Sequence, residues 1–108
     1  MANTFTSYVN KDVGTSAATV VTVGASTQTT VIGMTASNTT SSSVTVDVYI
    51  TRSAVNYYII KGATVPAGGS LVIVGGDQKV VLVVSDALKI VSSAASSIDA
   101  VTSVLEIT

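Results

Sequence analysis

Side chains able to perform acid–base or metal chemistry are few and widely spaced in this 108-residue chain. It contains no His and no Cys, so neither imidazole nor thiolate is available as a base or a metal ligand. A Ser–Lys dyad is formally possible with Lys11, Lys61, Lys79 or Lys89, but no S-x-x-K motif in a helical context accompanies these lysines. We therefore expect no enzymatic activity, no catalytic residue, no metal site and no cofactor.

The carboxylates form no pair or cluster that would suggest a site. Asp77 and Asp86 fall in predicted turns, where Asp commonly accepts a hydrogen bond from its own local backbone. Asp47 and Asp99 occupy outward positions on predicted strands. No D-x-D-x-D spacing indicates calcium, and nothing marks two acids as a glycosidase pair. The pattern favours turn and surface acids.

The composition departs from that of an ordinary soluble domain. Only 10% of residues are charged and the net charge is −1, whereas typical domains carry about 25% charged residues. In their place stand 20 Val, 16 Thr and 15 Ser. A free monomer normally relies on mixed surface charge for solubility. We expect that partner chains cover much of the surface.

The same balance argues against nucleic acid and membranes as partners. Five Lys and Arg offset by six acidic residues provide no basic patch. No apolar run reaches the roughly 18 residues of a membrane-spanning helix. The first residues, MANTFTSYVNK, lack the basic start and apolar core of a secretory signal.

Alternating apolar and polar residues dominate the chain and predict strands. In Ser43–Thr51 the apolar residues recur at every second position, which is typical of a half-buried strand. Gly33 lies inside another predicted strand and suggests a bulge or the close approach of another backbone. The predicted strands are Thr4–Asn10, Ala18–Val23, Gln28–Ser37, Ser43–Thr51, Val55–Ile60, Ser70–Val74, Lys79–Val84, Leu88–Ser92 and Ile98–Ile107.

Strands of this length and spacing predict an all-β fold: a single antiparallel β-sandwich of jelly-roll type with about 8–9 short strands. It would span residues 1–108 as one domain, with residues 1–17 as either an N-terminal arm or the first strand. The closing strand, Ile98–Ile107, is apolar on both faces. Such a strand lies centrally in a sheet or is covered by a second subunit.

Much of the chain resembles a group of small virion proteins of tailed bacteriophages, especially phages of marine bacteria and cyanobacteria. The resemblance is carried by Thr30–Gly33, by Ser43–Val48, by the run YYIIKGATVPAGGSLVIVGGDQKVVL at Tyr57–Leu82, and by LKIVSSAASSIDAVTSVLEI at Leu88–Ile107. Residues 1–20 match least, and Ser85-Asp86 stands where Gly-Asp is expected.

The resemblance implies a non-enzymatic structural protein located in the virion. We expect a capsid decoration or cement protein, a homotrimer in contact with other virion proteins such as the major capsid protein. A neck, tail or fibre component that contributes to assembly or host attachment is the alternative. Tyr and Arg are favoured at binding hot spots. The candidate interface residues are therefore Tyr8, Tyr49, Arg52, Tyr57 and Tyr58, with one of the last two expected in the core.

Overall fold

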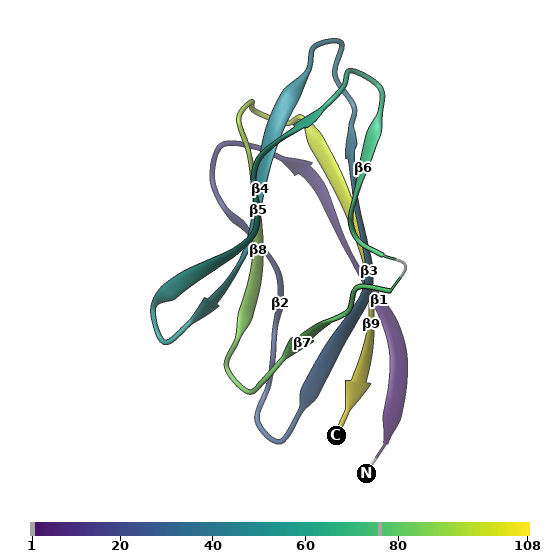
Figure 1. The fold of residues 1–108 in the computed structure, drawn as a ribbon, viewed down its shortest axis with the longest axis vertical. Coiled ribbons are helices and arrows are strands. Elements are labelled where there is room, and N and C mark those ends of the chain that lie inside the picture. Colours follow the sequence, from purple (N-terminus) through teal and green to yellow (C-terminus); the bar gives the residue numbers. More distant parts are fainter. Residues whose placement is uncertain (1, 76) are drawn as a thin grey trace.

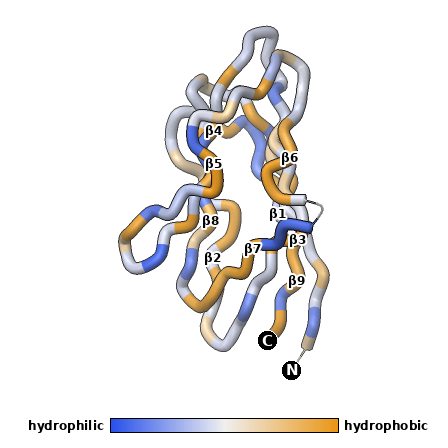
Figure 2. Tube along the Cα trace, in the orientation of Figure 1, coloured by the Kyte–Doolittle hydropathy of each residue, from blue (hydrophilic) through white to orange (hydrophobic). Residues whose placement is uncertain are grey.

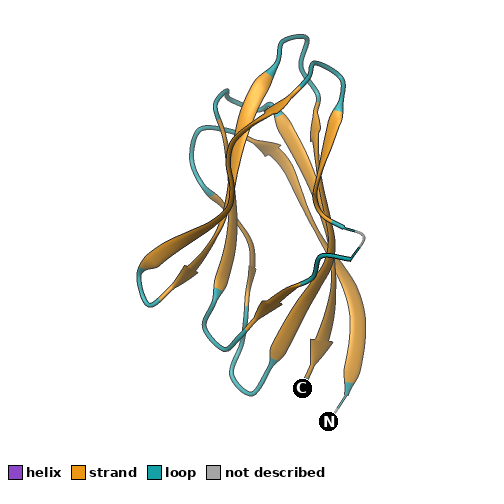
Figure 3. Cartoon of the chain, in the orientation of Figure 1, coloured by secondary structure: helices purple, strands orange, loops and turns teal. Residues whose placement is uncertain are grey.

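Alternating β-branched residues form strands throughout the computed structural model, which describes residues 2–75 and 77–108 (Figure 1). The described part of the chain consists of strands and loops, without a helix (Figure 3). The strands are β1 (Asn3–Val13), β2 (Ala18–Thr22), β3 (Gln28–Asn38), β4 (Val44–Arg52), β5 (Val55–Val65), β6 (Ser70–Val74), β7 (Val80–Leu82), β8 (Ala87–Ser92) and β9 (Ile98–Ile107). The predicted all-β class is confirmed.

The strands form two antiparallel sheets that pack face to face. The first sheet has the order β1-β9-β3-β6, with β7 also paired to β3, and the second has the order β2-β8-β4-β5. β6 pairs with Met34–Ser37 and β7 with Thr29–Val31, so together they occupy one strand position beside β3. Apart from β4–β5 and β6–β7, each connection crosses from one sheet to the other, which is the arrangement of a jelly roll.

The core lies between the inner faces of the two sheets. It consists mainly of Val, Leu and Ile side chains, among them Val31, Val48, Leu88, Ile90 and Val104, all with no solvent exposure. Hydrophobic segments run along both sheets rather than gathering at one end (Figure 2). β9 lies between β1 and β3, which confirms the central position predicted from its two apolar faces.

A bulge in β3 keeps its apolar residues pointing inward along the whole strand. Val31 pairs with Val104 and Gly33 with Ser103, so Ile32 is an extra residue in the ladder. Before the bulge the odd-numbered residues Thr29 and Val31 are buried; after it the even-numbered Met34 and Ala36 are. An extra residue reverses the side-chain alternation. The bulge predicted from Gly33 is confirmed.

Two further bulges explain why β5 and β1 extend beyond their predicted ends. Gly62 has φ +67° inside β5, and its N–H donates to the Asp47 carboxylate at 2.7 Å. Asp12 has φ +54° near the end of β1, and its N–H donates to Asp99 at 3.0 Å. Each outward carboxylate therefore holds a bulge on the neighbouring strand. Because the ladder resumes after each bulge, both strands continue.

The Thr102 hydroxyl offers a test of the packing. Thr102 is fully buried on the inner face of β9, and its Oγ1 has no hydrogen-bond partner among the described residues. A buried hydroxyl without a partner costs free energy that a methyl group of similar size does not. We expect Thr102→Val to raise the free energy of unfolding by about 1 kcal/mol in urea titrations. A loss of stability would show that this hydroxyl is satisfied.

Candidate interaction surface

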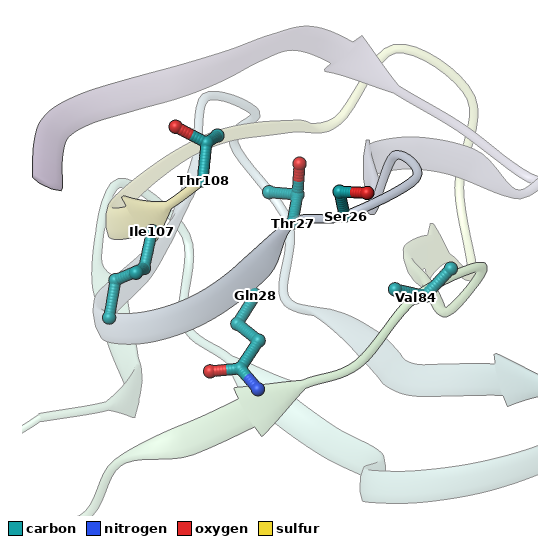
Figure 4. A pocket seen from close by; sticks show the side chains of 6 residues that line it. All are labelled: Ser26, Thr27, Gln28, Val84, Ile107 and Thr108. Atoms are coloured by element: carbon teal, nitrogen blue, oxygen red, sulfur yellow. The ribbon is translucent and has the colours of Figure 1, made fainter. Parts of the chain in front are cut away.

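The described residues contain no cluster of ligating side chains suited to metal binding. No group of three or more Asp or Glu side chains is close enough to hold an ion. One surface depression, of about 350 Å³, is lined by Ser26, Thr27, Gln28, Val84, Ile107 and Thr108, none with an ionisable side chain (Figure 4). No helix among the described residues is long and apolar enough to cross a membrane.

Arg52, a predicted interface residue, is engaged in an ion pair within the protein. Its guanidinium donates from Nε and Nη2 to the two carboxylate oxygens of Asp86, at 2.7 and 2.6 Å. The Asp86 carboxylate accepts the Val83 N–H of the β7–β8 turn, as expected of a turn acid. Its side chain is only 1% exposed, so this turn acid is buried. The hydrogen bonds from Arg52 are the main reason that the pKa of Asp86 lies below its usual value.

Tyr8 lies on the inward side of β1 and is half-buried. Its hydroxyl donates to the Glu106 carboxylate on β9. This hydrogen bond, together with burial, raises the pKa of Tyr8 to about 12. The hydroxyl therefore stays protonated, and its hydrogen bond to Glu106 links β1 to β9.

The other three predicted tyrosines gather on the β4–β5 hairpin. Tyr49 and Tyr58 are cross-strand partners whose ring centroids lie 5.0 Å apart, and the Lys61 ammonium sits 4.3 Å from the centre of the Tyr58 ring. Tyr57 lies on the opposite face of the hairpin. Tyr57 and Tyr58 are 56% and 44% exposed, so the expectation that one of them belongs to the core is wrong.

The most exposed apolar side chains lie instead on the outer face of the first sheet. Phe5 is 74% exposed and Val9 73%, and three further valines on this face are at least half exposed. We call these five residues the outer patch: Phe5, Val9, Val72, Val81 and Val101.

The register arranges the outer patch in two rows across the sheet. One row runs across β1, β9, β3 and β7, and its residues in that order are Phe5, Leu105, Thr30 and Val81. In the other, Val9 pairs with Val101, Val101 with Thr35, and Thr35 with Val72. Cross-strand partners project from the same face of a sheet. Three of the four strand positions therefore contribute exposed apolar side chains to this face, and β3 contributes Thr30 and Thr35 between them.

This face has the size of a protein interface, and the charged residues beside it form ion pairs. Four strand positions about 4.8 Å apart and eleven residues long span about 700 Å². A standard interface buries about 800 Å² on each partner. The charged residues at the nearby end of β1 are paired, since Lys11 contacts both Asp99 and Asp12. The hydrogen bond to Asp99 is the main reason that the pKa of Lys11 is raised.

Sequence reasoning did not identify the outer patch, because it selected residue types associated with hot spots. The patch residues come from β1, β6, β7 and β9, and become neighbours only through the strand order. One signal was present in the sequence: Phe5 and Val9 fall on the same side of the predicted strand Thr4–Asn10, with polar residues at most other positions.

Solved structures that share this fold include two chains from unrelated sources. A chain from Bacillus endospore appendages, a novel family of disulfide-linked pili, superimposes with a TM-score of 0.57 and 15% sequence identity, over 99% of this chain and 87% of that one. A chain of infectious bursal disease virus, Gx strain, superimposes with a TM-score of 0.53 and 11% identity, over 96% of this chain.

This chain spans about a third, 32%, of the length of the viral chain. No family model and no curated protein matches the sequence. At identities of 15% and 11% the two superpositions demonstrate a shared fold.

Proposed function

We propose that this protein is a structural subunit of a phage virion, a capsid decoration protein that binds the shell through the outer patch. The observation that carries the proposal is the gathering of five exposed apolar side chains on one sheet face. The likeness to a pilus chain and a viral chain supports it, because both come from large assemblies. The resemblance to small virion proteins supports the phage setting.

The proposed role of the protein is to stabilise the capsid shell by binding to it. Burying exposed apolar area against the shell is favourable by roughly 25 cal/mol per Å² before the costs of association. A protein that binds the assembled shell and not its unfolded subunits stabilises the shell by mass action. The sequence contains no cysteine, so these contacts do not include disulfide links such as those of the pili that share the fold.

The test uses particles purified from the source of the protein and stripped of this chain. Wild-type protein added back is expected to bind and to raise the temperature at which the particles release their genome. Val101→Glu places a charge at the centre of the outer patch and is expected to reduce binding at least 100-fold, since an unpaired charge is costly to bury.

Thr45→Glu is the matched control, because Thr45 is exposed on the second sheet, away from the outer patch. It is expected to bind like wild type. Equal binding by the Val101→Glu variant, or wild-type protein that binds only to tails, would contradict the proposal.

A neck, tail or fibre component is the second candidate, favoured by the exposed tyrosines on the β4–β5 hairpin. Exposed Tyr57 and Tyr58 beside Lys61 provide the aromatic area typical of binding hot spots. In that case Tyr57→Ala and Tyr58→Ala would abolish host attachment and leave particle stability unchanged.

A further inference from the structure

The open edge of β1 differs from every other sheet edge in the described part of the chain. β1 is the terminal strand of the first sheet, and its pairing with β9 runs from Asn3 to Asn10 without a register shift. These eight residues include no charge, no Gly and no Pro. A long, regular, uncharged edge is a template for pairing with another strand.

The other edges carry features that prevent such pairing. β2 has five residues and a register shift between Thr19 and Val21. β5 contains two irregularities together with Lys61 and Gly62. β6 and β7 have five and three residues. Short strands, bulges and lysines are the usual means of protecting an edge.

The backbone groups available on the β1 edge follow from the ladder. Ala2 and Thr108 exchange both hydrogen bonds, N to O at 3.1 Å and 3.0 Å. Since hydrogen-bonded and non-hydrogen-bonded pairs alternate in antiparallel sheets, the even-numbered residues direct their N–H and C=O groups toward β9. Asn3, Phe5, Ser7 and Val9 therefore direct theirs outward.

We propose that β1 pairs antiparallel with β1 of a second copy. The twofold axis passes midway between the two Ser7 residues, and the two first sheets join into one continuous sheet. The proposal goes beyond the decoration role and holds whether or not the protein binds a capsid. A second copy is the occupant because its β1 is the one edge of equal length and regularity in the described structure.

The side chains of β1 favour one register for the pairing of the two β1 strands. With Ser7 opposite Ser7, Phe5 lies opposite Val9 of the second copy, and Val9 opposite Phe5, on the outer face. Aromatic and β-branched residues make favourable cross-strand pairs. The uncharged edge brings no like charges together. A twofold pairing closes with two copies, so this edge favours a dimer in place of the homotrimer expected for a decoration protein.

Sedimentation equilibrium tests the pairing. Wild-type protein is expected to have twice the 10.8 kDa mass of one chain. Ser7→Pro removes an outward N–H and leaves the β9 ladder intact, so the variant should fold and sediment as a monomer. Ser7→Thr keeps the N–H and should remain a dimer. Monomeric wild-type protein, or a Ser7→Pro variant that stays dimeric, would overturn the proposal.

Cysteine cross-linking tests the register without relying on Ser7→Pro to fold. The chain has no Cys, so each variant carries a single thiol. Ser7→Cys is expected to form a disulfide-linked dimer on mild oxidation, because directly opposed Cα atoms are about 5.5 Å apart. Phe5→Cys lies opposite Val9 and should stay reduced; rapid linkage of Phe5→Cys with none at Ser7→Cys would overturn the register.

Different variants test the decoration role and the β1–β1 dimer, so one proposal can be contradicted while the other holds. Val101 lies on β9, one strand away from the open edge. Val101→Glu is therefore expected to keep the dimer and lose shell binding, whereas Ser7→Pro is expected to lose the dimer. A dimer that does not bind particles would remove the decoration role and keep the β1 pairing.

Discussion

Asp86→Ala is expected to lower the free energy of unfolding by about 3 kcal/mol. The Asp86 carboxylate accepts two hydrogen bonds from Arg52 at the end of β4 and a third from the Val83 N–H. Its backbone accepts the Val23 N–H as well, so this residue joins the β2–β3 connection, the β7–β8 turn and the end of β4. Removing the carboxylate leaves the Val83 N–H unpaired. Thermal unfolding should show a loss of more than 10 °C.

The pH dependence of the unfolding free energy tests whether the charge of the Asp86 carboxylate causes this loss of stability. The pKa of Asp86 is lower in the folded protein than in the unfolded chain, mainly because of Arg52. Its stabilising effect is therefore complete above about pH 4 and is lost as the pH falls through the folded-state pKa. The difference in unfolding free energy between wild type and Asp86→Asn should shrink below pH 4. A difference independent of pH would contradict the ion pair.

Met34→Ala is expected to cost about 3 kcal/mol through a cavity at the centre of the sandwich. Met34 is 1% exposed, and its strand β3 is the one that pairs with β9, β6 and β7. Its cross-strand partners are Thr102 and Val74, both buried. Because three strands meet at β3, we expect little relaxation around the missing side chain. Urea unfolding monitored by circular dichroism measures the loss.

Met34→Leu is the matched control for the cavity. Leu fills a similar volume, and such exchanges usually cost less than about 1.5 kcal/mol. If both variants lost the same stability, the cause would be the shape of the site rather than its volume.

Strand positions could be predicted from the sequence because alternation of Val with Ser and Thr is a local property. All nine predicted strands overlap observed ones, and Ser70–Val74 and Ile98–Ile107 coincide with β6 and β9. The errors fall where the alternation breaks. The predicted strand Val55–Ile60 ends before Lys61-Gly62, whereas β5 continues to Val65. The bulge at Gly62 is held by Asp47 on another strand, and such a contact cannot be recognised from the local sequence.

The candidate site was harder to predict because it depends on contacts distant in the sequence. Arg52 and Asp86 are 34 residues apart, and nothing local marks Asp86 as buried. Phe5 and Val81 share a row of the outer patch only because β9 and β3 lie between their strands. Charge content was informative in a different way: it indicated a surface in need of partners without locating it.

Cryo-electron microscopy of the intact particle tests the central claim, that the outer patch is buried against other virion proteins, most directly. We expect density for this β-sandwich on the capsid, with the face that carries Phe5, Val9 and Val101 turned toward neighbouring subunits and the β4–β5 hairpin pointing away. A sandwich located on the particle with that face in solvent, or a particle without this chain, would contradict the account.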